Sequence, residues 1–171
     1  MKGEKNAEEV VKILNMQEDI LQFEHFTNED AIELGNIMLS EAKVRGLSAA
    51  ISIRRSNGAI VFQAMMDGTT PDNIDWIERK FNTVMRVETS SLLWFMKTKE
   101  HDITMQNKDL PDDYYATCGG GFPVRIEEAG VIGAIMVSGL SHVADHDFIV
   151  KCLSKYLHTD EVPRIQTEKD K

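Results

Sequence analysis

The chain lacks the features that mark several large classes of protein. Its 171 residues contain only two cysteines, Cys118 and Cys152, which lie apart and do not have the spacing of metal ligands. They are typical of reduced thiols rather than of a disulfide framework. No apolar run is long enough to span a bilayer, and no segment has the form of a secretory signal. We therefore expect a cytoplasmic protein without a membrane partner.

Positive charge is also scarce. The chain has 19 Lys and Arg against 28 Asp and Glu, a net charge of −9, and no basic tract. Such a chain does not attract nucleic acid or anionic membranes, so we expect neither as a partner. The hydrophobic content of 42% is ordinary for a globular domain. Without repeats or linkers, residues 1–171 are expected to form a single domain in which 162–171 are a flexible polar tail.

The first third of the chain predicts two helices followed by a hairpin. Apolar residues recur at helical spacing from Val10 to Leu21. Thr27, with an acidic residue three positions later, is a capping-box variant that begins a second helix. Residues 49–54 and 59–65 are β-rich, and the Asn-Gly pair between them is the strongest short-range signal of a hairpin.

The middle of the chain predicts one long helix. Pro71 suits a first helical turn, and an apolar stripe continues to about Lys97. Glu88 falls within that stripe, where an unpaired carboxylate would be costly. Trp76 and Trp94 flank the stripe, so a second element should cover them. We expect that element to come from another subunit, which predicts a homo-oligomer.

The last third predicts two further strands and a final helix. Residues 122–126 and 130–137 are rich in β-formers, 114–117 form a further candidate strand, and Ser141 can cap the helix that follows. Residues 98–113 are polar and aperiodic. Strands joined by tight turns favour an α+β fold, with a single, mainly antiparallel sheet of about five strands flanked by helices.

Two glycine-rich segments resemble a known family. Residues 120–124 read Gly-Gly-Phe-Pro-Val, residues 133–139 read Gly-Ala-Ile-Met-Val-Ser-Gly, and Asp145 follows at the expected acidic position. With a Lys-x-x-Thr pattern at Lys80, this set resembles the GlcG/HbpS-like superfamily, often labelled haem-degrading domain, and more closely its uncharacterised bacterial and yeast branch. The resemblance implies a sheet flanked by helices and an oligomer. Some relatives bind haem, but no catalytic residue is implied, so the question of an enzyme stays open.

The glycine run 119–121 has two interpretations. Successive backbone N–H groups in a turn can bind an anion. Glycine also lets a backbone turn and pass close to a neighbour, and this run lacks the Gly-Lys-Ser/Thr of a phosphate loop.

The histidines near the last helix start also have two interpretations. His142 and His146 are four residues apart and share one helical face, so they could bind a metal ion. No third ligand stands out, however, and Asp145 between them suits the first turn of a helix. A structural or ligand-lining role is the alternative, and it is the one that we favour.

Our leading hypothesis is an oligomeric domain that binds a small anionic or planar ligand. The ligand would lie where the long helix meets the glycine turn and the last helix start. The candidate residues are Arg79, Lys80, Asn82, Thr83, Arg86, Gly120, Gly121, Phe122, Asp145 and His146. One alternative is a non-enzymatic scaffold or partner-binding module. Another is a haem protein or a metal-dependent enzyme that uses His142 and His146. The cofactor is unknown, and haem is not expected because these histidines have polar surroundings.

Overall fold

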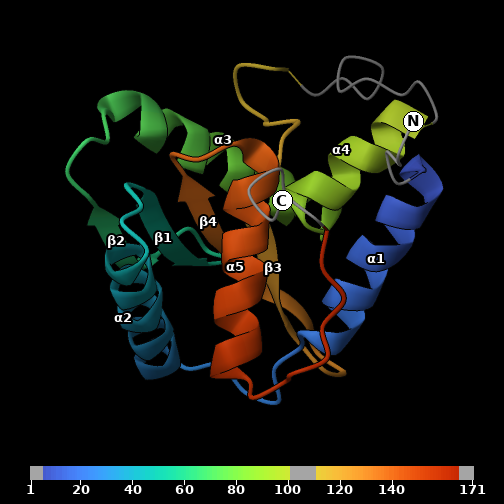
Figure 1. The fold of residues 1–171 in the computed structure, drawn as a ribbon, viewed down its shortest axis with the longest axis horizontal. Helices are drawn as coiled ribbons and strands as arrows, with labels where there is room; N and C mark the ends of the chain where they lie inside the picture. The colour runs from blue at the N-terminus through green and yellow to red at the C-terminus, as the bar shows by residue number, and fades with distance from the viewer. Residues whose placement is uncertain (1–5, 101–110, 166–171) are drawn as a thin grey trace.

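The computed structural model describes residues 6–100 and 111–165. Residues 101–110 of the aperiodic segment 98–113, and residues 166–171 of the predicted tail 162–171, lie outside these ranges, whereas residues 98–100 belong to helix α4. The elements in chain order are α1 (Ala7–Ile20), α2 (Asn28–Val44), β1 (Ala50–Arg55), β2 (Ile60–Met65), α3 (Pro71–Val87), α4 (Ser91–Glu100), β3 (Gly121–Ile126), β4 (Gly130–Ser138) and α5 (His142–Tyr156) (Figure 1). No helix in the described ranges is both long and apolar enough to cross a membrane.

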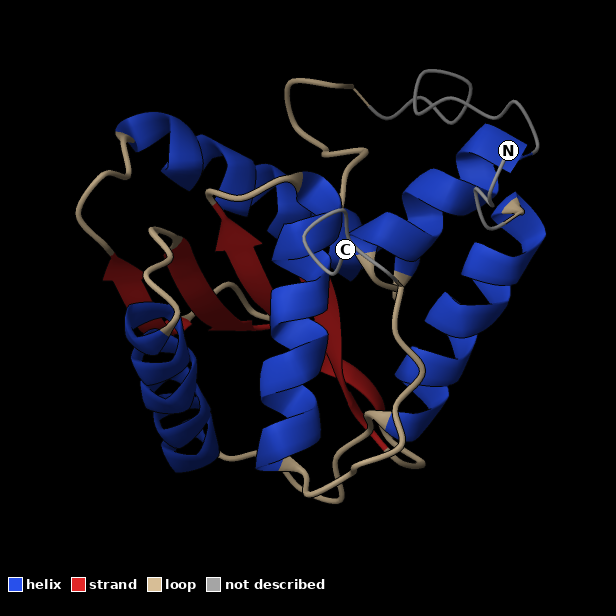
Figure 2. Ribbon diagram, viewed as in Figure 1, coloured by secondary structure: helices blue, strands red, loops and turns tan. Residues whose placement is uncertain are grey.

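The described strands form one antiparallel sheet in the order β2-β1-β4-β3. Helices α2 and α5 pack on one face of the sheet and α3 packs on the other (Figure 2). The predicted α+β class is confirmed. The sheet has four strands rather than about five, because the candidate strand at 114–117 is a turn that lies against α3.

The two faces of the sheet differ in composition because side chains alternate along each strand. On β1, Ile51 and Ile53 point toward α2 and α5 and belong to the larger apolar core. Ala50, Ser52 and Arg54 point toward α3, and all three are buried. One face is therefore an ordinary hydrophobic core, whereas the other buries polar groups under a helix.

The predicted long helix is wrong at Glu88. This residue ends α3 in the left-handed conformation, with φ of 57°, and its side chain is exposed. Its N–H donates to Val84 at 2.8 Å, and Ser90 caps the next helix by accepting from the N–H of Leu93 at 3.2 Å. The turn lets α4 leave the sheet and pack on α1, where Leu14 lies among the apolar side chains of α4.

The local signals elsewhere are confirmed. Thr27 caps α2 in a capping box with Asp30. The Asn-Gly pair joins β1 to β2, with Gly58 at φ of 88°. Ser141 caps α5, its side chain accepting from the N–H of Ala144. Because Ser141 caps α5 three residues after β4 ends, the start of this helix lies beside the end of that strand.

Candidate functional site

A buried ion pair joins α3 to the start of α5. Lys80 Nζ lies 3.1 Å from Asp145 Oδ2, and each side chain is only 3% exposed. The same ammonium donates to the carbonyl oxygen of Val137 at 2.7 Å, and Asp145 Oδ1 accepts from the N–H of Leu140 at 2.9 Å. The pair therefore joins α3 to the end of β4 and the start of α5, which lie 57 to 65 residues further along the chain.

Burial and the partners of Asp145 act on its pKa in opposite directions. Burial raises the pKa of Asp145 to about 6, whereas Lys80 and the N–H groups of Leu140 and Gly139 act to lower it. Because that value lies below neutral pH, the carboxyl is mainly ionised at pH 7. A buried charge of this kind is tolerated only when it has partners, which Lys80 and the turn after β4 supply.

The glycine run allows the backbone to pass against this pair. Gly120 has φ of +115°, and a Cβ there would lie 2.5 Å from the Val137 carbonyl oxygen and 2.6 Å from Lys80 Nζ. A Cβ on Gly119 would lie 2.2 Å from the carbonyl oxygen of His142. The N–H of Gly121 donates to Ser91 Oγ at 2.9 Å. Close backbone packing, the second of the two interpretations, accounts for these glycines.

A cleft of about 380 Å³ opens beside the ion pair. Its walls carry two aromatic side chains, its base carries the ion pair, and small polar groups complete the lining. We call it the Lys80 cleft; it is lined by Trp76, Lys80, Phe95, Thr117, Cys118, Ser138, Leu140, His142 and Asp145. It combines apolar walls with a few convergent polar groups, as ligand sites commonly do.

His142 contributes a neutral imidazole to the cleft. Its Nδ1 accepts from the N–H of Gly119 at 3.2 Å, so the proton of the neutral ring lies on Nε2. Burial and the positive charge of Lys80 lower the pKa of His142, which keeps the ring neutral at physiological pH. Phe95 packs edge-on against it, with the ring centres 5.2 Å apart. His142 is therefore a hydrogen-bond donor through Nε2.

His146 lies in a different environment. It is buried, and its Nε2 lies 2.8 Å from Gln17 Oε1. The amide nitrogen of Gln17 donates to the carbonyl of Pro163 at 2.8 Å, which turns its oxygen toward the imidazole and places the His146 proton on Nε2. Burial lowers the pKa of His146 to about 3. Within residues 6–100 and 111–165, no three acidic, histidine or cysteine side chains converge on a metal-binding geometry.

The polar arc of α3 binds the segment that precedes the glycine run. Arg79 donates to the carbonyl of Asp112 at 2.6 Å, Asn82 donates to that of Tyr114 at 3.0 Å, and Thr83 donates to that of Ala116 at 2.9 Å. Arg86 is exposed. The arc was recognisable from helical spacing, but the carbonyls that occupy it come from about 30 residues away.

A further predicted site residue lies away from the cleft, and some residues that line the cleft were not predicted. Phe122 is buried in the apolar core with α2 and α5, on the face opposite Lys80. Trp76, Phe95 and Ser138 line the cleft, although the sequence analysis did not assign them to a site. Trp76 could have been found, since it lies four residues before Lys80 and so shares its helical face.

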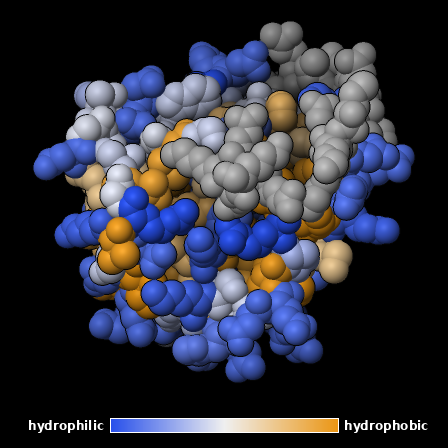
Figure 3. All heavy atoms as spheres, viewed as in Figure 1, coloured by the Kyte–Doolittle hydropathy of each residue, from blue (hydrophilic) through white to orange (hydrophobic). Residues whose placement is uncertain are grey.

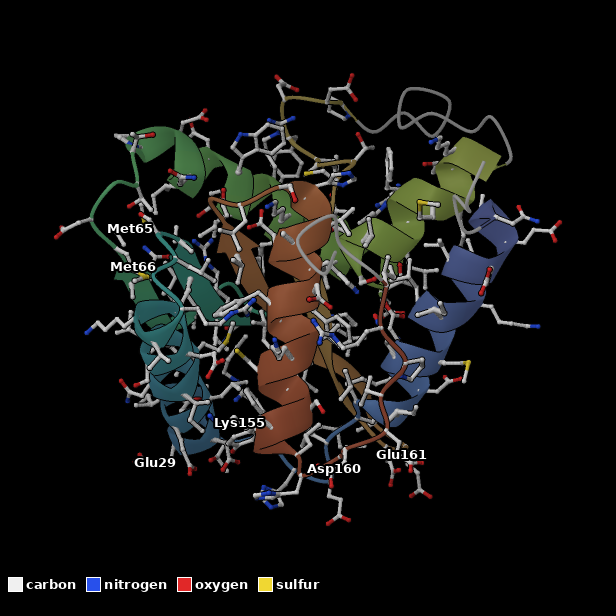
Figure 4. The ribbon with its side chains drawn as sticks, viewed as in Figure 1. Glu29, Met65, Met66, Lys155, Asp160 and Glu161 are labelled. Atoms are coloured by element: carbon white, nitrogen blue, oxygen red, sulfur yellow. The ribbon has the colours of Figure 1, made fainter. Side chains whose placement is uncertain are left out.

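A larger hollow of about 580 Å³ lies between α2 and α5. Glu29 and Lys155, labelled in Figure 4, are among its lining residues, and charged groups surround scattered apolar ones on this side of the molecule (Figure 3). Its ion pair, from Lys155 to Glu41 at 3.5 Å, has side chains 68% and 22% exposed. The smaller Lys80 cleft is the better candidate because its charged groups are buried and oriented.

Comparison with known proteins agrees with the resemblance seen in the sequence. A family model described as haem degrading protein HbpS-like matches residues 26–154. A UPF0303 protein of Paraburkholderia xenovorans (strain LB400) is 40% identical over 151 residues, which are 88% of this chain and 91% of that protein. These matches show that the chain belongs to the HbpS-like family.

Solved structures share the fold. The crystal structure of the Ybr137w protein is 28% identical, with a TM-score of 0.80 over 91% of this chain and 90% of that one. A structure described as a PduOC:Heme complex is 18% identical, with a TM-score of 0.60 over 82% of this chain and 99% of that one. At 18% identity the likeness shows the fold alone.

Proposed function

We propose that this member of the HbpS-like family binds a small molecule in the Lys80 cleft. The observation that carries the proposal is the buried pair of Lys80 and Asp145 at the base of the cleft. A buried ion pair is seldom worth more to stability than well-packed apolar residues of the same volume. Its position beside a cleft with aromatic side chains favours a role in recognition.

The polar groups of the cleft support binding more directly than catalysis. The ammonium of Lys80 has two acceptors among the described residues, Val137 and Asp145, so one of its three N–H donors remains for a ligand. Burial raises the pKa of the Cys118 thiol, which disfavours the thiolate that a nucleophile needs. We assign binding as the activity and name no reaction.

The description of the family suggests haem as a ligand. Haem iron needs an axial ligand with a free lone pair. In the Lys80 cleft, His142 has its lone pair on Nδ1 engaged with Gly119 and presents Nε2–H, and the Cys118 thiol stays protonated. The described lining residues therefore do not fit haem. We predict no saturable, stoichiometric shift of the Soret band when haem is titrated into the protein; such a shift, lost in His142→Ala or His146→Ala, would contradict the prediction.

Self-association in the cytoplasm is a second role, favoured by the edge of the sheet. Strand β2 is an edge strand, and Ile60 and Met65 on it are 52% and 41% exposed. An open antiparallel edge can pair with its copy across a two-fold axis. Met65 and its neighbour Met66 are labelled in Figure 4. A mass by light scattering well above 19.3 kDa is expected, and a stable monomer at micromolar concentration would contradict this role.

The binding proposal is tested with a library of small metabolites and thermal shift. Ligands that raise the melting temperature of the wild type should lose that effect in Trp76→Ala, which removes one wall of the cleft. Lys155→Ala, at the α2–α5 hollow, is the matched control and should respond like the wild type. The proposal fails if no compound in the library gives a shift, or if the shifts are lost in Lys155→Ala but retained in Trp76→Ala.

A further inference from the structure

We infer that the Lys80 cleft selects planar, uncharged molecules that carry a carbonyl group, and discriminates against the matching carboxylates. This inference rests on the proposed function, because it names the class of ligand for that same cleft. It is drawn from three features of the lining: its net charge, its excess of hydrogen-bond donors, and its aromatic walls.

The charge at the base of the cleft sums to zero. Lys80 Nζ and Asp145 Oδ2 lie 3.1 Å apart, with both side chains 3% exposed. An anion near the ammonium would also lie near the carboxylate, so it would lose its hydration without a net attraction. Arg79 and Lys99 do not line the cleft, so they offer an anion there no direct contact, although their charges act on Cys118 and His142 in its lining. The acidic charge of −9 on the chain adds to the disadvantage of an anion.

Three of the polar groups in the lining have a hydrogen to donate. Lys80 keeps one N–H, and neutral His142 carries its proton on Nε2. Ser138 Oγ accepts from Asn73 Nδ2 at 3.1 Å, so its hydroxyl proton can be donated. Both carboxylate oxygens of Asp145 already accept hydrogen bonds. A carbonyl oxygen, with two lone pairs and no charge, complements such a lining.

The walls favour a flat ligand. Trp76 and Phe95 both line the cleft and come from different helices, α3 and α4. The guanidinium of Arg79 lies 4.1 Å from the centre of the Trp76 ring and restrains the orientation of the indole. Aromatic rings attract planar groups by stacking and by edge contacts. A planar amide, ketone or heteroaromatic carbonyl compound therefore fits both the walls and the donors.

The test compares benzamide with benzoate, which have nearly the same shape and differ in charge. Isothermal titration at about pH 7.5, where Asp145 with its pKa of about 6 is ionised, measures both dissociation constants. We expect benzamide to bind at least about tenfold more tightly than benzoate. Cyclohexanecarboxamide, which keeps the amide but is not planar, should bind more weakly than benzamide. Trp76→Ala should weaken benzamide binding by about tenfold.

Asp145→Asn separates a charge effect from a merely structural one. Removing the carboxylate leaves the charge of Lys80 uncompensated, so the affinity of benzoate relative to that of benzamide should rise by about tenfold. Circular dichroism checks that this variant is folded. If the variant is not folded, the inference is judged by the preference of the wild type for benzamide over benzoate. Lys155→Ala is then the control, and it should keep that preference.

The outcomes distinguish this inference from the proposed function. Benzoate binding as tightly as benzamide to the wild type would overturn the inference and leave the cleft as a binding site. Binding of both compounds that persists in Trp76→Ala would place them elsewhere and overturn it too. Absence of binding by either compound at millimolar concentration also overturns it, whereas the proposed function fails only if the metabolite library gives no shift that depends on Trp76.

Discussion

The two faces of the sheet use the same strands for different purposes. Toward α2 and α5, β1 and β4 present Ile51, Ile53 and Val137 in a continuous apolar core. Toward α3, the same strands present small or polar side chains such as Ser52 and Arg54, both buried. The small residues leave space for long cationic side chains to lie between helix and sheet.

The buried cations of the polar face are satisfied by specific partners. Arg54 donates to Ser52, to Gln63 and to Glu78, and Lys80 donates to Val137 and to Asp145. Burial of apolar area stabilises the first face in proportion to area. The second face has a smaller apolar cluster, which includes Ile77 and Val84, and it also buries charges that are tolerated only while they keep their partners. Substitutions on the two faces should therefore differ in size and in their dependence on pH.

The largest effect is expected on the apolar face. Phe122 is 1% exposed there, so Phe122→Ala should lower the free energy of unfolding by about 4 kcal/mol through lost burial and a cavity. Urea denaturation followed by circular dichroism measures the change at pH 8, where His146, whose ring centre lies 5.8 Å from that of Phe122, is neutral in both variants. Val44→Ala, at a side chain 84% exposed, is the control and should change little. A loss for Phe122→Ala no larger than that for Val44→Ala would contradict the tight packing of this face.

Lys80→Met should have the second largest effect. It should lower the free energy of unfolding by about 3 kcal/mol near pH 7.5, because it leaves the buried Asp145 carboxylate without its cation. The cost should shrink toward pH 5, where the unpaired carboxyl takes up a proton. Adding Asp145→Leu to Lys80→Met should recover much of the loss. If the single variant is as stable as the wild type at pH 7.5, the ion pair is not held as the structure indicates.

Gly120→Ala should cost about 2 kcal/mol more than Gly58→Ala in the same urea assay. Both glycines have positive φ, but a Cβ at Gly120 meets the Val137 carbonyl and Lys80, whereas a Cβ at Gly58 meets nothing within 4 Å. The difference between the two variants isolates the close approach from the backbone preference. Equal costs would show that Gly120 is needed only for its backbone conformation and not for the close approach to Lys80.

Two neighbouring residues of α5 should respond to acid in opposite directions. The folded-state pKa of His146, about 3, lies below its ordinary 6.5, so its stabilisation is present above pH 6.5 and is lost as pH falls. The folded-state pKa of Asp145, about 6, lies above its ordinary 3.8, so its stabilisation is present below pH 3.8 and is lost as pH rises through 6.

From pH 7 to pH 5 the contribution of His146 to stability falls by about 2 kcal/mol and that of Asp145 rises by about 1 kcal/mol, so the two oppose each other. From pH 7 to pH 5, His146→Gln should therefore gain stability relative to the wild type, and Asp145→Asn should lose it. Urea midpoints at the two pH values measure both changes. Identical pH profiles for the two variants would be inconsistent with these opposed shifts.

The smallest effect is expected at the exposed ion pair. Lys155→Met removes the contact with Glu41, in which the lysine side chain is 68% exposed, and should change the free energy of unfolding by about 0.5 kcal/mol or less. High salt should make this change in the free energy of unfolding smaller still. A loss comparable to that of Lys80→Met would erase the distinction between the buried and the exposed pair.

Much of the local structure was predictable because its signals lie within a few residues. The capping box at Thr27 and the turn at Gly58 act over four residues or fewer, and both are confirmed. The helix break at Glu88 was missed because a left-handed glutamate carries no local signal of glycine or proline. Residue spacing also placed His142 and His146 on one helical face, but their hydrogen-bond partners, Gly119 and Gln17, lie 23 and 129 residues away.

The sequence by itself determined the family, the fold class, most element starts and the acidic charge, because period, capping and composition act locally or add up along the chain. The tertiary structure decided that Lys80 pairs with Asp145 across 65 residues, that Arg79 and Asn82 bind backbone carbonyls, and that Trp76 lines a cleft. Those outcomes depend on which partner each buried polar group meets when α3 packs on β4. A hydrogen bond of that kind is specified by geometry in three dimensions, which no spacing within one element records.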